Sequence, residues 1–204
     1  MFDIGDKVVH PTHGAGLVKG IKEQDLLEQF HRYYVIDLAI DQSRTLMIPV
    51  SNAEEIGLRS ISQKPVLSQV WHTLDATAET LSDDYKKRQK RIQEKLKTGN
   101  AIKVAEVIRD LSALKREDHL TSFDTKLLER AQQFLASEVA LVEGVQVGKA
   151  ERMISETLDN GMESPVAREE AAEESTAKEV HQPILTNRRI RQLAKQAMKR
   201  LHPR

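Results

Sequence analysis

The sequence predicts an α+β protein in which a small, strongly bent β-barrel precedes a compact all-α domain and a C-terminal tail. Residues 1–60 contain short runs of β-branched and aromatic residues separated by glycine and polar clusters. Residues 66–158 repeat apolar side chains at intervals of three and four, as amphipathic helices do. Residues 159–186 are acidic and rich in small residues, which is typical of a flexible linker.

The β-rich runs of residues 1–60 centre on Val8-Val9, on Leu17-Val18, on residues 33–38 and on residues 45–50. Strands this short and this closely spaced predict a barrel that bends sharply at its turns.

One of these turns, His13-Gly14-Ala15-Gly16, has two interpretations. A phosphate-binding Gly-x-Gly loop normally opens a helix, and no helical pattern follows here, so a bend between two strands is favoured. His10 and His13 lack a third ligand nearby in the sequence, which favours turn-capping or partly buried histidines over a metal site.

A polar, proline-ended linker at residues 61–65 separates the barrel from the helical residues. The first helix is expected from Val66, with Val70, Leu74 and Trp71 on its apolar face, and Trp71 is interpreted as core or inter-domain packing. Further helices are expected at residues 85–97, 101–115 and 147–158, and one that starts at residues 121–124 and extends to Val142. Ser82-Asp83-Asp84 would cap the helix at 85–97, and Gly99-Asn100 would end it.

The helix expected at residues 85–97 is strongly basic. It starts with an aromatic residue, Tyr85, and carries seven cations: Lys86, Lys87, Arg88, Lys90, Arg91, Lys95 and Lys97. The formal net charge of the chain is zero, but cations crowd into residues 86–103 and 188–204 and anions into residues 159–179. A chain with this segregation can present a local patch that binds polyanions.

Catalysis and membrane insertion are not expected from the remaining residues. The chain has no cysteine, and we find no catalytic carboxylate pair, Ser/His/Asp arrangement or metal-ligand cluster, so we expect no cofactor, no metal and no enzyme activity. The charge pairs Arg109-Asp110 and Glu129-Arg130 are interpreted as solvated or capping pairs. Without a signal peptide or a long apolar run, we expect a soluble cytoplasmic protein.

Several segments of the sequence resemble the CarD/CdnL family of bacterial transcription regulators. They are FDIGDKVVHPTHGAGLVKGI, IPVSNAEEIGLR, EKLKTGNAIKVAEVIRDL and LLERAQQFLASEVALVE, and the resemblance covers about residues 1–158 in one order. It implies a Tudor-like (SH3-like) barrel, shared with the transcription-repair coupling factor, that docks on the β subunit of RNA polymerase. It also implies a helical domain that contacts promoter DNA, independently of sequence, at the upstream edge of the bubble. We therefore expect a monomer that associates with the nucleoid.

The resemblance assigns roles to particular residues. The position of a tryptophan that wedges into the minor groove falls on Tyr85, and a basic position of a later helix falls on Thr125, beside Lys126. The DNA-contacting set is Tyr85, Lys86, Lys87, Arg88, Lys90, Arg91 and Lys126. Two polymerase-contacting positions fall on Gln24 and Met47, with Ile48 and Pro49 beside them. Tyr85 keeps an aromatic face of smaller area than tryptophan, and simple packing at the helix start remains the alternative.

The C-terminal tail has the pattern of a basic helix. Asn187 can cap a basic amphipathic helix over residues 187–204, which would bind nucleic acid or a partner protein, or remain a solvated tail. For the whole chain, two alternatives to a polymerase-bound regulator stay open: a stand-alone nucleic-acid-binding protein, and an adaptor that uses its helices only for protein contacts.

Overall fold

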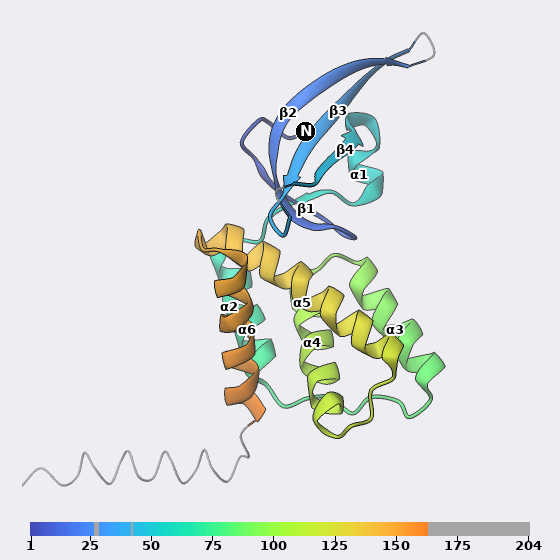
Figure 1. The fold of residues 1–204 in the computed structure, drawn as a ribbon, viewed down its shortest axis with the longest axis vertical. Coiled ribbons are helices and arrows are strands. Elements are labelled where there is room, and N and C mark those ends of the chain that lie inside the picture. The colour runs from blue at the N-terminus through green and yellow to red at the C-terminus, as the bar shows by residue number, and fades with distance from the viewer. Residues whose placement is uncertain (27–28, 42, 163–204) are drawn as a thin grey trace, which may run out of the picture. The chain divides into compact units, whose positions relative to one another are not determined.

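The computed structural model describes residues 1–26, 29–41 and 43–162 (Figure 1). The tail helix expected at 187–204 and nearly all of the linker expected at 159–186 lie outside these residues. The strands are β1 (Lys7–His10), β2 (Gly14–Leu26), β3 (Gln29–Leu38), β4 (Thr45–Pro49) and β5 (Arg59–Ser60). A 3-10 turn at Val50–Asn52 and the short helix α1 (Ala53–Ile56) lie between β4 and β5. The prediction of a β-rich N-terminal part is therefore confirmed.

The five strands form one antiparallel sheet in the order β4-β3-β2-β1-β5. The pairing of β2 with β3 shifts register between Val18 and Gly20, and such a bulge bends a strand. Gly16 lies so close to β3 that an added Cβ atom would stand 2.6 Å from the Asp37 carbonyl oxygen. The sheet encloses a small core of its own, formed by Val8, Val18, Tyr34, Ile36, Ile48, Ala53 and Leu58.

The turn between β1 and β2 has the role expected from the sequence. The His10 Nδ1 atom accepts hydrogen bonds from the backbone N–H groups of Thr12 (3.0 Å) and His13 (3.3 Å). Burial lowers the pKa of His10 and the neighbouring His13 lowers it further, so the ring stays a neutral acceptor. The interpretation of His10 as a turn-capping residue is confirmed.

Five longer helices follow the barrel: α2 (Lys64–Asp75), α3 (Tyr85–Lys97), α4 (Ala101–Arg116), α5 (Ser122–Glu143) and α6 (Val147–Met162). The first begins two residues before the position expected from the sequence and carries Pro65 in its first turn. Its buried residues are Leu67, Val70 and Leu74, with Trp71 partly buried against the same core. The interpretation of Trp71 as a packing residue is thus confirmed, whereas Leu67 replaces Val66 at the centre of the buried face.

The charge pair Arg109-Asp110 is buried, so its interpretation as a solvated or capping pair is wrong. Arg109 is 6% exposed and Asp110 is 2% exposed. The Asp110 carboxylate accepts hydrogen bonds from the Arg109 side chain (2.8 Å) and from the backbone N–H of Glu79 (3.0 Å). Because that second bond ties the α2–α3 connection to α4, the pair fixes the segment that leads into α3.

Candidate nucleic-acid interface

Helix α3 begins and ends where the sequence predicts. The Asp84 carboxylate accepts hydrogen bonds from the backbone N–H groups of Lys86 (2.9 Å) and Lys87 (3.3 Å), which satisfies two donors of the first turn. At the other end Gly99 takes a left-handed conformation, with φ of 61°, and its N–H bonds the Leu96 carbonyl at 3.1 Å. These caps fix the two ends of α3.

One side of α3 is a row of exposed cations. We call this row the cation face: Lys86, Lys87, Lys90, Arg91 and Lys97. At about 3.6 residues per turn these positions occupy one side of the helix, with exposed Glu94 among them. Lys87 lies 3.9 Å from Asp84, and Arg91 lies 3.9 Å from Glu79, but these pairs are exposed and long. Such pairs are weak, so the cations remain available to an external anion.

The opposite side of α3 is buried, and this side includes Arg88. Its side chain is 6% exposed, and its guanidinium donates to the Asp124 carboxylate (2.7 Å) and the Ser82 carbonyl (2.9 Å). The expectation that Arg88 contacts a DNA phosphate does not fit this position, because its charge is already used inside the protein. Arg88 instead attaches α3 to α5.

Asp124, the partner of Arg88, also organises the start of α5. It forms a capping box with Thr121, whose hydroxyl donates to the carboxylate at 2.8 Å. Burial alone would raise the pKa of Asp124, but the hydrogen bonds from Arg88 and Thr121, with the charge of Arg88, hold that pKa below its usual value. The carboxylate is therefore charged at neutral pH and pairs with Arg88.

Lys95 also turns inward. Its ammonium lies 2.7 Å from the Glu106 carboxylate on α4, and its side chain is 18% exposed. Of the seven cations of the basic run, Arg88 and Lys95 thus hold the helix in place, and the other five form the cation face.

Tyr85 lies at the edge of the cation face, on the side of α3 that carries Arg88 and Ile92 one and two turns later. Its side chain is 50% exposed, and the Lys86 ammonium stands 5.9 Å from the centre of its ring. Tyr85 also lines a cavity of about 540 Å³, whose wall includes Glu79, Asp83 and Glu117. An aromatic side chain therefore projects between a basic surface and an acidic cavity.

Phe123 of α5 is a further exposed residue near α3 that the sequence did not single out. Arg130, which the sequence placed in a solvated or capping charge pair, is exposed close to it. Phe123 is 45% exposed, and with Lys97 and Arg130 it lines a groove of about 420 Å³ between the barrel and the helices. Lys126 is exposed one turn after Phe123. An aromatic residue in the first turn of a helix, ahead of two cations spaced by four, is the signal that would have identified this group.

The residues expected to contact polymerase lie on strands β2 and β4. Met47 of β4 is 43% exposed, whereas Ile48 is 2% exposed and belongs to the barrel core. The side chain of Ile48 therefore does not fit the expected contact. Gln24 pairs with His31 in the β2–β3 hairpin. In the described part of the chain β4 pairs only with β3, so its other backbone edge is open.

The described residues give no sign of a metal site or of a helix that crosses a membrane. No group of three His, Cys, Asp or Glu side chains is placed there to hold a metal ion. Nor does any helix of the described part have the length and apolar character needed to cross a membrane.

Comparison with known proteins decides the family. Residues 2–62 match the model of the CarD-like/TRCF RID domain, and residues 69–155 match that of the CarD C-terminal domain. The chain is 36% identical, over 145 residues, to the Bacillus subtilis (strain 168) protein described as "Putative transcription factor YdeB". That alignment covers 71% of this chain and 94% of the relative. The chain belongs to the CarD/CdnL family.

Family membership confirms two expectations from the sequence. The antiparallel sheet is the Tudor-like domain of CarD proteins, and the helices after it are the CarD C-terminal domain. Both matching models carry the name of CarD, a family of transcription regulators. The cation face of α3 thus belongs to the CarD C-terminal domain, and the open edge of β4 belongs to the RID domain. The groove beside Phe123 is lined by residues of both domains.

Proposed function

We propose that this CarD-family protein docks on the β subunit of RNA polymerase through its barrel and stabilises the promoter open complex by holding the upstream duplex with α3. The observation that carries the proposal is the cation face, five exposed cations on one side of a helix whose other side is fixed by the buried pair of Arg88 and Asp124. A rigid row of cations suits the phosphates of a DNA strand.

The cation face favours binding that is independent of base sequence. Lysine and arginine side chains that neutralise phosphates release counterions, so affinity falls with salt by a slope of about 0.9 per phosphate contacted. Lys86, Lys87, Lys90 and Arg91 are the proposed phosphate contacts, with Lys126 as an additional one from α5. Arg88, which the resemblance placed among the DNA contacts, is left out because it is buried against Asp124.

Tyr85 is the proposed contact with the edge of the bubble. Its half-exposed ring stands at the start of the cation face, where a strand bound by Lys86 and Lys87 would bring a base step within reach. Wedging an apolar side chain into a base step costs a few kcal/mol of stacking. Tyrosine has less area than tryptophan to offset that cost, and so we expect a weak wedge.

The barrel supplies the proposed anchor. Its open β4 edge can add a strand from a partner, and Met47 offers an exposed apolar side chain on that strand. Pro49 ends the strand, and Gln24 lies on β2, across β3 from this edge. Ile48 would contribute only its backbone groups to the contact with that partner strand. The RID-type model that matches this part of the chain supports an interaction with RNA polymerase.

Anchoring explains how a weak DNA contact can regulate. Attachment to polymerase raises the effective concentration of α3 at the promoter, so few contacts suffice. A stabilisation of the open state by about 1.4 kcal/mol changes the ratio of open to closed complexes about tenfold.

The lifetime of the open complex tests the DNA contact. In the variant Lys87→Ala/Lys90→Ala two cations of the cation face are removed, and we expect a shorter lifetime on a promoter that the native protein stabilises. The matched control is Lys103→Ala/Lys149→Ala, which removes two exposed lysines from α4 and α6. Equal lifetimes for the native protein and the first variant would favour an adaptor that uses its helices only for protein contacts.

Retention of the polymerase β subunit tests the anchor. In the full-length protein, Met47→Glu places a charge on the open β4 edge, whereas Ile4→Glu changes an exposed apolar residue that precedes β1. We expect Met47→Glu to reduce retention of β and Ile4→Glu to leave it unchanged. A native protein that binds duplex DNA but fails to retain β would instead be a stand-alone nucleic-acid-binding protein.

A further inference from the structure

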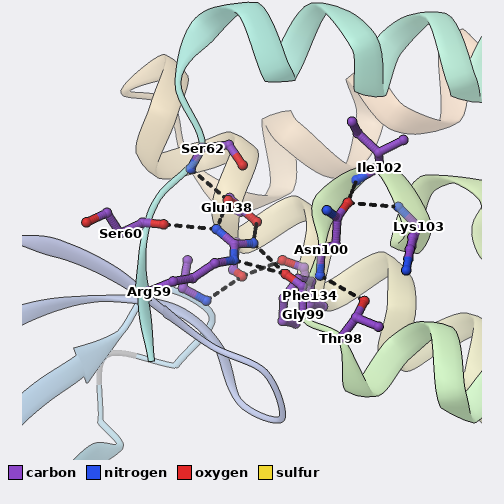
Figure 2. Close-up of polar contacts among 12 residues, drawn as sticks. Arg59, Ser60, Ser62, Thr98, Gly99, Asn100, Ile102, Lys103, Phe134 and Glu138 are labelled. Carbon is purple, nitrogen blue, oxygen red and sulfur yellow. Dashed lines mark hydrogen bonds and ion pairs between the residues drawn. The ribbon is translucent and has the colours of Figure 1, made fainter. Parts of the chain in front are cut away.

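Arg59 joins three parts of the molecule at one point (Figure 2). Its backbone belongs to β5, which pairs with β1 in the barrel. Its guanidinium donates to both carboxylate oxygens of Glu138 on α5, at 2.7 and 2.8 Å. The same guanidinium donates from Nε and Nη2 to the Gly99 carbonyl, at 3.0 and 2.6 Å. One side chain of the barrel therefore contacts both α5 and the turn that ends α3.

Glu138 fixes the position of this guanidinium. Its side chain is 1% exposed, and it also accepts a hydrogen bond from the Ser62 backbone N–H at 2.8 Å. A buried carboxylate is tolerated when its charge is paired and its oxygens are hydrogen-bonded. The two parallel N–H···O bonds from Arg59 meet that need and allow one orientation of the planar group. Of the donors left over, Nε and one N–H of Nη2 are aimed at Gly99, and one N–H of Nη1 donates to the Ser60 carbonyl at 3.0 Å.

The turn at Gly99 is held from the barrel on two sides. Besides the Arg59 bonds to its carbonyl, an added Cβ atom at Gly99 would stand 3.3 Å from the Pro11 Cβ of the β1–β2 turn. Lys97, the last cation of the cation face, comes two residues earlier. The C-terminal end of α3 is thus attached directly to the barrel, and the other four cations of the cation face lie farther along the same helix.

Other contacts join the barrel to α5 without Arg59. The Ala15 backbone N–H donates to the Ser137 hydroxyl at 2.9 Å, and the Lys7 ammonium donates to the Leu141 carbonyl at 2.7 Å. Val9 and Ala15 also belong to the helical core. Among the described residues, however, Arg59 alone makes hydrogen bonds from the barrel to the α3–α4 turn. Loss of these bonds would release the α3–α4 turn from the barrel, while Arg88 and Lys95 still hold α3 to the other helices.

We propose that Arg59 is a positioning residue that fixes the orientation of α3 relative to the barrel, so that the polymerase anchor and the cation face act as one rigid unit. The role in transcription rests on the function proposed above, whereas the rigid joint itself does not. A rigid link aligns α3 with DNA as soon as the barrel is bound, and a loose link lowers its effective concentration there.

The test separates the Gly99 bonds from the ion pair. Arg59→Lys keeps a positive charge beside Glu138 but loses the planar fork that reaches Gly99 at the same time. Arg59→Gln/Glu138→Gln removes both charges together, which avoids leaving either one buried and unpaired. The matched control is Arg44→Lys, which alters a barrel arginine that pairs with Asp41 on the surface. Circular dichroism and thermal unfolding are to be measured first, to check that each variant is folded.

Spin labels report the joint directly. The chain has no cysteine, so Lys22→Cys and Glu94→Cys place two nitroxides, one on β2 and one on α3, in an otherwise unlabelled protein. We expect a narrow distance distribution for the native residues and for Arg44→Lys, and a broader one for Arg59→Lys and the double variant. Distributions of equal width for these two variants and the native protein would overturn the rigid joint.

Open-complex lifetime, measured with the same substitutions in the unlabelled chain, tests the role in transcription. We expect Arg59→Lys to shorten the lifetime by about 3- to 10-fold while retention of the polymerase β subunit is unchanged. A broader distance distribution with an unaltered lifetime would overturn the positioning role. If the native protein itself leaves the lifetime unchanged, the proposed function fails, and the distance measurement alone then decides whether the joint is rigid.

Discussion

At the scale of single residues, the cations of α3 divide by burial into two kinds. Lys87 is exposed for 81% of its side chain and Arg88 for 6%, although they are neighbours in the sequence. Composition cannot distinguish them, because the partner of Arg88 lies 36 residues away on another helix. The same limit applies to Asp110, whose partners include a backbone N–H in the α2–α3 connection.

Asp124→Asn tests the buried pair. The substitution leaves the Arg88 charge buried without a counter-ion, and we expect the free energy of unfolding to fall by about 3–5 kcal/mol. The control, Asp41→Asn, removes the partner of an exposed arginine and should cost at most about 1 kcal/mol. Urea denaturation of both variants measures the difference. Similar losses for the two would show that burial does not set the strength of the Arg88 pair.

The depressed pKa of Asp124 predicts how stability depends on pH. A carboxyl group whose pKa is lower in the folded state binds protons more weakly there than in the unfolded chain, so it favours folding above the unfolded-state value of 3.8. That contribution is lost as pH falls through the folded-state pKa. In Arg88→Met/Asp124→Leu the free energy of unfolding should decline less steeply below pH 3.8 than in the native protein. Parallel declines would contradict this origin of the pH dependence.

Tyr85 is tested by a pair of substitutions with opposite expected effects. Tyr85→Ala removes the aromatic face and should shorten the open-complex lifetime, whereas Tyr85→Trp enlarges that face and should lengthen it. Phe123→Ala removes the other exposed aromatic of the helical domain, and its lifetime shows whether that residue acts in the same way as Tyr85. A lifetime that responds to neither Tyr85 substitution would leave Tyr85 as a packing residue.

At the scale of elements, local signals predict both ends of α3 correctly, and the features that the sequence did not predict depend on distant contacts. Asp84 and Gly99 act within their own turns, and for that reason their capping roles were predictable. The burial of Ile48 also follows the alternation of a strand, since Met47 beside it faces outward. The exposure of Phe123 depends on how α5 packs, whereas its position ahead of two cations spaced by four can be read from the sequence.

The salt dependence of DNA binding belongs to α3 as an element. With Lys90→Ala, one proposed phosphate contact is lost, and the slope of log affinity against log salt should become shallower by about 0.9. Lys103→Ala, on α4, should keep the native slope. Titrations with a short duplex at several salt concentrations measure both, and an unchanged slope for Lys90→Ala would exclude that lysine from the contact.

At the scale of the whole molecule, the described part of the chain combines an open strand edge, the proposed anchor, with a basic helix, the proposed DNA contact. Arg59, Glu138 and Gly99 join the two. The order of a barrel before helices was predictable from the change of apolar periodicity near residues 61–65. The joint formed by Arg59, Glu138 and Gly99 was not predictable, because its strand, helix and turn are distant in the sequence and meet only in the fold.

Site-specific crosslinking of α3 in the polymerase–promoter complex tests the central claim most directly. Lys90→Cys gives a single thiol in a chain without cysteine, and a photoreactive aryl azide attached there marks what the cation face touches. The proposed function predicts crosslinks to DNA at the upstream edge of the bubble, dependent on polymerase and absent for the same label at Lys149. Crosslinks only to polymerase subunits, or DNA crosslinks equally strong without polymerase, would contradict it.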